Sequence, residues 1–220
     1  TEREQYRREL ERQNERLESF ASMVSHDLRN PLNVAMARLE LTRSEYDDEN
    51  LETVADALRR METLVDDVLA LARQGQPIDE PTTVSLSALA ESAWEMVDAA
   101  DGRLDIDGEI TFAADSDRLQ QLLENLYRNA LEHGRSEGEP LRIRVGPLDD
   151  EGFYVEDDGV GIPEADHEEV FESGYTTTTH GTGFGLAIVS EIVSAHGWTI
   201  SVTEGRDGGA RFEIRGVEPR

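Results

Sequence analysis

The first 73 residues place apolar side chains at helical spacing. One mostly apolar set follows alternating steps of four and three, as in a coiled-coil seam: Tyr6, Leu10, Gln13, Leu17, Phe20 and Val24. We predict a helix that continues to about Ser44 and bends at Pro31. A polar turn at residues 46–50 then leads to a second helix at residues 51–73. Its predicted buried stripe is Val54, Leu58, Met61, Leu64, Val65, Val68, Leu69 and Leu71.

Two antiparallel helices cannot bury stripes of this width alone. We therefore expect a homodimer in which two hairpins form a four-helix bundle. A linker rich in glycine and proline follows at residues 74–81.

The remaining chain mixes both periodicities. Helices are predicted at residues 87–99, 115–133 and 185–195, and strands at residues 109–113, 141–145, 153–156, 198–203 and 210–214. Residues 173–182 show neither period and are predicted to form a loop. The expected fold class is α+β, with a helical hairpin followed by an α/β sandwich whose sheet carries helices on one face.

The charge balance narrows the range of partners. The net charge is −27, and all 21 basic residues are arginine. Such a surface repels DNA and anionic lipid, so we expect neither nucleic-acid binding nor direct membrane contact. We interpret the charge as solubility in concentrated salt, which is typical of a halophile. The absence of cysteine excludes disulfides, and no apolar run has the length of a membrane span.

A histidine beside an aspartate lies in the first predicted helix. The Asp27 carboxylate can orient the His26 ring and raise its basicity, which makes the imidazole a competent nucleophile toward a phosphoryl group. Asn30 lies one turn later on the same face. Taken alone, such a pair is more often two solvated side chains.

Three further motifs lie in the second half of the chain. Asn125 and Asn129 share one helix face, and amide oxygens suit Mg²⁺, although an exposed polar helix face is the better explanation when the pair is taken alone. Asp157 precedes Gly159 and Gly161 at the end of a predicted strand. Its carboxylate can accept a hydrogen bond at this turn, and the glycines allow close approach to the backbone. The remaining motif is a run of glycines that opens a predicted helix and exposes backbone N–H groups to phosphate: Gly181, Thr182, Gly183, Phe184, Gly185 and Leu186.

Together, in this order, the four motifs resemble the H-box, N-box and two glycine boxes of sensor histidine kinases, over about residues 20–214. The resemblance implies that His26 is phosphorylated, that Asp27 is a general base, and that Asn30 positions water for dephosphorylating a partner. It implies ATP and Mg²⁺ as cofactors, with Asn129 as the metal ligand and Asn125 assisting. It also implies that Asp157, rather than the competing Asp158, accepts from the adenine amino group.

The remaining nucleotide contacts are implied in the same way. They are His133, Gly159, Gly161, Thr182, Gly183, Gly185 and Leu186, although His133 is equally well explained as a helix-end residue. Phe171 falls in the position of the family's F-box, and residues 176–179 in its ATP lid. The family often has a lysine where this chain has Glu132, and whether Arg128 or Arg135 compensates stays open.

The resemblance implies a kinase core that autophosphorylates on His26 and passes the phosphoryl group to an aspartate of a response regulator, with phosphatase activity in addition. The expected parts are a signalling helix at 1–19, a dimerisation and phosphotransfer domain at 20–74, a linker at 75–82 and an ATP-binding domain at 83–220. We expect a cytoplasmic piece of a longer protein, since it begins at Thr1, with any membrane anchor elsewhere.

Two rival functions remain open at this point. An ATPase related to chaperones or mismatch-repair proteins would share the last three motifs but has no use for the His26 segment, and usually has a glutamate where this chain has Asn125. A scaffold with an inactive nucleotide site is favoured only by the missing lysine.

Overall fold

The computed structural model describes residues 2–46, 48–72, 78, 81–97, 102–134, 140–149, 152–176 and 182–220, with side chains in the first helix described mainly from Phe20 onward. The predicted seam positions Tyr6, Leu10, Gln13 and Leu17 therefore lie outside the described side chains, as does Leu71. The chain divides into two compact units, Thr1–Gly75 and Gln76–Arg220, and each is described by itself. None of the described helices is both long and apolar enough to cross a membrane.

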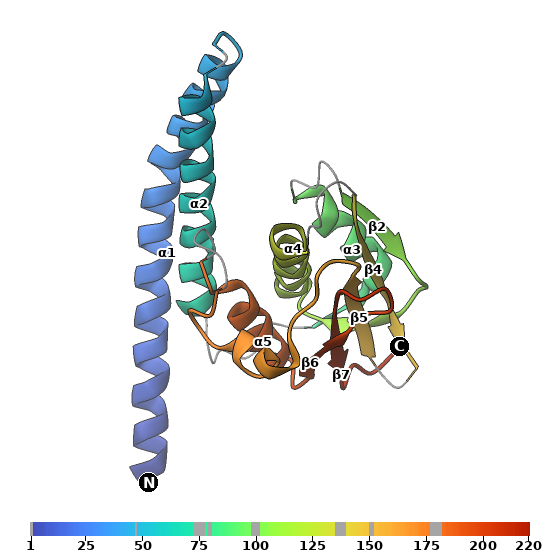
Figure 1. The fold of residues 1–220 in the computed structure, drawn as a ribbon. Coiled ribbons are helices and arrows are strands. Elements are labelled where there is room, and N and C mark those ends of the chain that lie inside the picture. Colours follow the sequence, from blue (N-terminus) through green and yellow to red (C-terminus); the bar gives the residue numbers. More distant parts are fainter. Residues whose placement is uncertain are drawn as a thin grey trace. The chain divides into compact units, whose positions relative to one another are not determined.

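The first unit is a hairpin of two long helices, α1 (Glu2–Arg43) and α2 (Glu49–Ala72), close to the predicted bounds (Figure 1). Pro31 lies inside α1, as predicted. Asp48 starts α2, because its Oδ1 accepts the Asn50 backbone N–H at 2.8 Å. Between the helices, the Arg29 guanidinium donates to Asp66.

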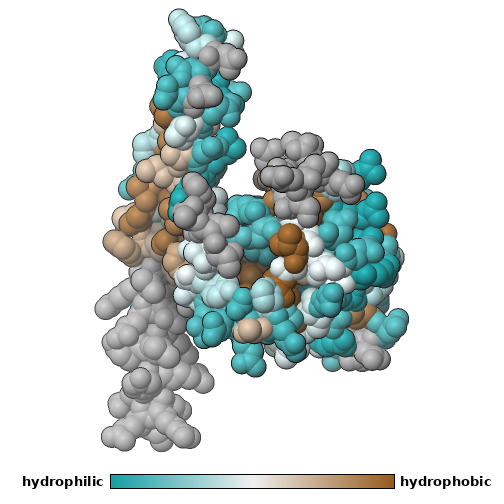
Figure 2. All heavy atoms as spheres, in the orientation of Figure 1, coloured by the Kyte–Doolittle hydropathy of each residue, from teal (hydrophilic) through white to brown (hydrophobic). Residues whose placement is uncertain are grey.

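Few of the apolar side chains described in the hairpin are buried. The buried ones are small or lie at scattered positions: Ala21, Leu32, Ala55 and Ala72. Four of the seven described residues of the stripe predicted on α2 are exposed in the single hairpin, including Val54, Met61 and Val68. Brown apolar atoms accordingly run along the hairpin surface in Figure 2.

The second unit is a mixed sheet with helices against it (Figure 1). The five-stranded sheet has the order β2-β4-β5-β7-β6, with β2 and β4 parallel and the other pairs antiparallel. A separate pair, β1 and β3, is antiparallel. The strands are β1 (Thr82–Ser85), β2 (Gly102–Ile106), β3 (Thr111–Ala114), β4 (Leu141–Leu148), β5 (Gly152–Asp157), β6 (Thr199–Glu204) and β7 (Ala210–Arg215). The helices are α3 (Leu86–Glu95), α4 (Ser116–His133) and α5 (Gly185–Ala195), with short 3₁₀ turns η1 (Glu164–Asp166) and η2 (Glu169–Phe171).

Three sequence predictions need correction here. The helix predicted at 87–99 ends at Glu95, because the N–H of Met96 bonds back to the Ala93 carbonyl and closes the last turn. Strands β1 and β2 were not predicted, since each is short and flanked by turn residues or acids. The strand predicted at 141–145 extends to Leu148, where it pairs with Gly152 of β5.

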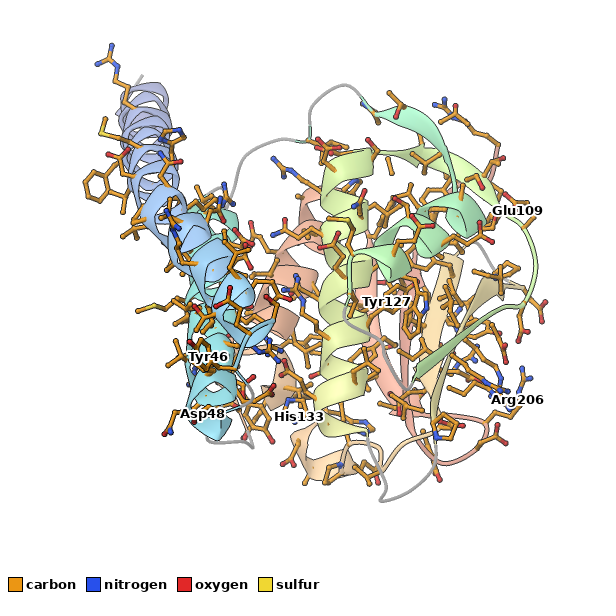
Figure 3. All side chains as sticks on the ribbon, turned by 90° about the horizontal axis from the view of Figure 1, so that it is seen from above. Tyr46, Asp48, Glu109, Tyr127, His133 and Arg206 are labelled. Carbon is orange, nitrogen blue, oxygen red and sulfur yellow. The ribbon has the colours of Figure 1, made fainter. Side chains whose placement is uncertain are left out.

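The core of the α/β unit lies between the helices and one face of the sheet. Helix α4 contributes the largest share of buried side chains: Leu119, Leu122, Leu123, Asn125, Leu126, Tyr127, Ala130 and Leu131. Phe112, Phe153 and Trp198 form an aromatic cluster with ring centroids 5.7–6.4 Å apart. Tyr127 projects from α4 within this unit (Figure 3), and its hydroxyl donates to the Ala90 carbonyl at 3.3 Å.

The opposite face of the sheet carries charged side chains, yet all six residues of β5, the central strand, are buried. Glu156 is only 1% exposed. Its carboxylate accepts from Arg144 at 3.2 Å and from Arg211 at 2.7 Å, so the buried charge is paired from two neighbouring strands.

Candidate phosphoryl-transfer and nucleotide site

The hairpin presents His26 to solvent. The side chains of His26 and Asp27 are 75% and 74% exposed, and His26 Nδ1 lies 3.2 Å from Asp27 Oδ1. Asn30 is exposed one turn later on α1. Ser25 is buried, and Arg29 pairs with Asp66 of α2. The helix pair thus fixes the backbone on both sides of His26 and leaves its ring accessible.

Helix α4 carries the two predicted asparagines. The Asp115 carboxylate begins it by accepting the Arg118 N–H at 3.2 Å. Asn125 is buried and Asn129, one turn later, is half-buried. A Cβ built on Gly185 would lie 3.7 Å from Asn125 Oδ1, so this amide faces the start of α5. His133, labelled in Figure 3, is half-buried in the last turn.

Asp157 ends β5 with a carboxylate whose two oxygens differ. Oδ1 accepts the Gly159 N–H at 2.9 Å and the Ala210 N–H at 3.2 Å. Among the described residues Oδ2 accepts no hydrogen bond, yet it is not sealed from solvent. Burial raises the pKa of Asp157, against the opposing effect of the two backbone donors and with Asp158 and Glu156 adding to the rise. The free oxygen is therefore suited to accept from a ligand amino group.

Asp158 forms hydrogen bonds with the neighbouring strand β4. Its Oδ1 accepts the Arg142 N–H at 2.8 Å, and its own N–H donates to the Arg142 carbonyl at 3.2 Å. These bonds extend the pairing of β4 and β5 by one residue. The geometry therefore favours Asp157 over Asp158 as the ligand acceptor, as the spacing to Gly159 and Gly161 had suggested.

Several glycines near the predicted nucleotide site lie in close contact with other backbone segments. A Cβ on Gly159 would lie 2.3 Å from the Gly134 carbonyl oxygen, so the turn after β5 touches the end of α4. Gly183, at φ +72°, would place a Cβ 2.7 Å from Gly174, whose N–H donates to the Gly183 carbonyl at 2.9 Å. These contacts leave no room for side chains and bring the ends of the 173–183 loop together.

The first turn of α5 offers backbone donors. No side chain caps this helix at Phe184, whose N–H instead donates to Thr182 Oγ1 at 3.4 Å. Gly185 and Leu186 follow, both half-buried. Phe171 packs edge-on against Phe212 at 6.4 Å and anchors the loop at its start. Residues 177–179 of the predicted lid, with His180, Gly181 and Arg135, lie outside the described residues.

The donor set fits ATP with Mg²⁺. The open Oδ2 of Asp157 can take an amino group, and the uncapped start of α5 can take phosphate. No cluster of three His, Asp or Glu side chains able to hold a metal occurs within the described ranges. Mg²⁺ held by an Asn129 amide would thus take its other ligands from phosphate and water, which is its usual preference.

The sequence pattern did not identify two residues that contact Asp157. Gly209 lies against Asp157, where a Cβ would lie 2.3 Å from Oδ1, and Ala210 donates to that oxygen. A glycine pair just before a predicted strand was the available signal. Its proximity to Asp157 depends on the pairing of β5 with β7, which local pattern does not reveal.

Two family descriptions match separate parts of the chain. Residues 16–77 match the His Kinase A (phospho-acceptor) domain. Residues 114–218 match the histidine kinase-, DNA gyrase B-, and HSP90-like ATPase. The first contains His26 and the second contains Asn125, Asn129 and Asp157.

Curated relatives align along nearly the whole chain. Cyanobacterial phytochrome A of Nostoc is 32% identical over 220 residues, which is 93% of this chain and 29% of that protein. The sensor histidine kinase GtrS of Pseudomonas aeruginosa is 32% identical over 92% of this chain and 42% of its own length. The probable sensor histidine kinase TcrY of Mycobacterium tuberculosis is 35% identical over 89% and 45%. The chain thus spans less than half the length of these relatives.

Solved structures are also similar to this chain in fold. Full-length ShkA in complex with AMPPNP has 27% identity and a TM-score of 0.63, covering 92% of this chain and 46% of that one. The catalytic domain of histidine kinase ThkA has 29% identity and a TM-score of 0.52, covering 62% of this chain and 94% of that one. The α+β fold class predicted from the sequence is confirmed.

Proposed function

We propose that the chain belongs to the sensor histidine kinases and that it transfers the γ-phosphoryl group of ATP to His26. The observation that carries the assignment is the exposed ring of His26, whose Nδ1 faces the Asp27 carboxylate at 3.2 Å. A proton held at Nδ1 leaves the Nε2 lone pair to attack the γ-phosphorus. The new N–P bond replaces the bond to the leaving oxygen of ADP.

The nucleotide residues supply binding and orientation. Asp157 Oδ2 accepts from the adenine amino group, and the N–H groups at the start of α5 bind phosphate beside Thr182 and Gly183. Asn129 would hold Mg²⁺, with Asn125 beside it, and the metal would offset negative charge on the phosphates. Gly159, Gly161, Gly185, Leu186 and His133 line the same site. Because Glu132 adds a negative charge there, Mg²⁺ has more charge to offset than in relatives with a lysine.

The proposed reaction involves two protein partners, a second copy of this chain and a response regulator. We propose that two hairpins associate through the exposed apolar residues of α1 and α2 to form the four-helix bundle. A receiver domain of a response regulator then takes the phosphoryl group from His26 onto an aspartate, in the cytoplasm where ATP is supplied. Asn30, exposed one turn from His26, positions water when the partner is dephosphorylated.

One substitution can separate the proposed role of Asn30 from the phosphorylation of His26. Asn30→Ala should slow phosphate release from the phosphorylated partner severalfold and leave the loading of His26 close to unchanged. Equal loss of both activities would mean that the substitution only disturbs α1.

The charge of −27 supports a further element of the proposal. An anionic chain that binds an anionic nucleotide works best where dense counterions screen both charges, so we propose a halophilic setting.

Incubation with γ-labelled ATP tests the kinase proposal. The unmodified chain should acquire acid-labile, base-stable label, and His26→Gln should acquire none while ATP affinity stays unchanged. Asn33→Gln, an exposed amide on the same helix, is the matched control and should label normally. Released phosphate without label would instead indicate an ATPase, and label on His26→Gln would move the acceptor elsewhere.

A further inference from the structure

His196 joins the end of α5 to the start of α4. Its Nδ1 lies 2.7 Å from the carbonyl oxygen of Ile192, one turn back in its own helix. Its Nε2 lies 3.1 Å from the backbone nitrogen of Asp115. The ring is half-buried and stacks on Trp198, with 4.3 Å between ring centroids and 23° between planes. Three separate segments therefore hold this one imidazole.

The two hydrogen bonds fix the protonation of the ring. A carbonyl oxygen only accepts, so Nδ1 must carry a proton and donate to Ile192. A backbone N–H only donates, so Nε2 must be unprotonated to accept from Asp115. His196 can satisfy both neighbours only as the neutral Nδ1–H tautomer.

The charged groups around the ring do not overturn this preference. Burial lowers the pKa of His196; the Ile192 carbonyl and the Asp115 carboxylate oppose that effect, and Arg118 adds to it. Asp115 and Arg118 both belong to the start of α4, whereas the contacts from α5 and from Trp198 are a carbonyl and an indole.

The connected positions begin and end the elements that carry the nucleotide residues. Asp115 is the N-cap of α4, the helix of Asn125 and Asn129. His196 is the C-cap of α5, whose opposite end begins at Gly185 beside Asn125. A shift of α4 along α5 would therefore change the spacing between Asn129 and the glycines that start α5.

We propose that His196 is a positioning residue, which as a neutral imidazole locks α4 against α5 and so sets the spacing of the Mg²⁺–ATP site. This role rests on the proposed function. Protonation would place an N–H on Nε2 opposite the Asp115 N–H, and two donors cannot bond to each other. The lock should therefore release in acid, and ATP affinity should fall with it.

The direction of the pH effect can be worked out. The pKa of His196 in the folded protein lies below its ordinary value of 6.5, so the unfolded chain binds the proton more readily. The contribution of His196 to stability is complete above about pH 6.5 and is lost as the pH falls below that value.

Two variants of the 220-residue chain test the positioning role of His196. His196→Phe keeps an aromatic ring on Trp198 but removes both hydrogen bonds. His196→Gln places an amide oxygen near the Nε2 position, where it can accept from Asp115 without titrating. The dissociation constant for Mg²⁺–ATP and the KM and kcat of autophosphorylation should be measured from pH 5 to 8.

His196→Phe should weaken ATP roughly tenfold and raise KM more than it lowers kcat, because one buried donor loses its acceptor. His196→Gln should recover most of that affinity and lose less of it in acid than the unmodified chain. Unchanged ATP affinity in folded His196→Phe, or an equal acid response in His196→Gln, would overturn the positioning role. Absence of ATP binding in the unmodified chain at every pH would instead defeat the proposed function.

A measurement on the unmodified chain covers the case in which a variant fails to fold. A long-range proton–nitrogen NMR spectrum of the imidazole should show the proton on Nδ1 at neutral pH. Slow hydrogen exchange at the Asp115 amide should be lost together with that signal in acid. A proton on Nε2 at neutral pH would overturn the proposal.

Discussion

The two units of this chain differ in how many of their large apolar side chains are exposed. In the α/β unit, Met96 and Val160 are the large apolar side chains that stay exposed within the described ranges. In the much shorter hairpin there are many more: Phe20, Met23, Leu28, Val34, Leu41, Tyr46, Val54, Met61, Leu64 and Val68. The α/β unit thus closes a core of its own, whereas the hairpin leaves apolar side chains exposed, and we propose that a second hairpin covers them.

The charged residues follow the same division. The α/β unit encloses Glu156 between Arg144 and Arg211, so even a nearly inaccessible carboxylate is paired within one chain. The ion pair of Arg29 with Asp66 in the hairpin is about 40% exposed on both sides. Exposed pairs of this kind contribute about 0–1 kcal/mol, so they do not replace a missing core.

The largest expected effect is that of removing a core side chain from the α/β unit. Leu122→Ala should lower the free energy of unfolding by about 2–5 kcal/mol, because Leu122 is fully buried on α4. Leu28→Ala in the hairpin should cost no more than about 0.5 kcal/mol where the protein is monomeric. Urea unfolding at two protein concentrations measures both. Equal losses at low concentration would show that the hairpin already closes its own core.

A second substitution confines the effect to nucleotide binding. Asp157→Asn keeps an Oδ1 acceptor for Gly159 and Ala210 but turns the open Oδ2 into a donor. ATP affinity should fall about 10- to 100-fold, as for the loss of a hydrogen bond to a charged group. Affinity for inorganic triphosphate, which has no adenine, should stay the same. Calorimetric titration compares the two ligands, and matching losses would argue against the adenine contact.

The third test places a charge on the exposed face of each unit. Met61→Glu in α2 should weaken self-association at least tenfold, because it puts a charge where we expect a second hairpin to pack. Met96→Glu is the matched control, since Met96 is 70% exposed in the α/β unit and should not affect association. Sedimentation equilibrium measures both variants. A dimer that survives Met61→Glu with full affinity must use another surface.

The smallest expected effect is that of salt. Potassium chloride up to molar concentration should raise the melting temperature, because screening relieves the repulsion of a net charge of −27. Each kcal/mol recovered corresponds to roughly 2–4 °C for a chain of this size. Sucrose serves as the non-ionic control. A melting temperature that stays flat in potassium chloride would rule out screening as a source of stability.

Local signals were enough to predict most elements, and long-range pairing explains the remainder. Helix α5 was predicted at 185–195 and spans Gly185–Ala195, because glycines mark its start and Gly197 follows its end. Strand β1 was not predicted, since four residues after Pro81 become a strand only by pairing with β3. At the site, spacing favoured Asp157 over Asp158, and the hydrogen bonds of the two carboxylates favour the same residue. Its partner Ala210 and the lock at His196 arise from contacts between distant segments, which periodicity does not encode.

The strand order has a consequence for the time at which the sheet can form during synthesis. β7 is the last strand along the chain, yet it lies inside the sheet between β5 and β6. While the ribosome has not yet released β7, β6 has no neighbour and β5 exposes an unpaired edge. Exposed strand edges recruit other chains, so the nascent α/β unit is most vulnerable to aggregation just before its final strand emerges.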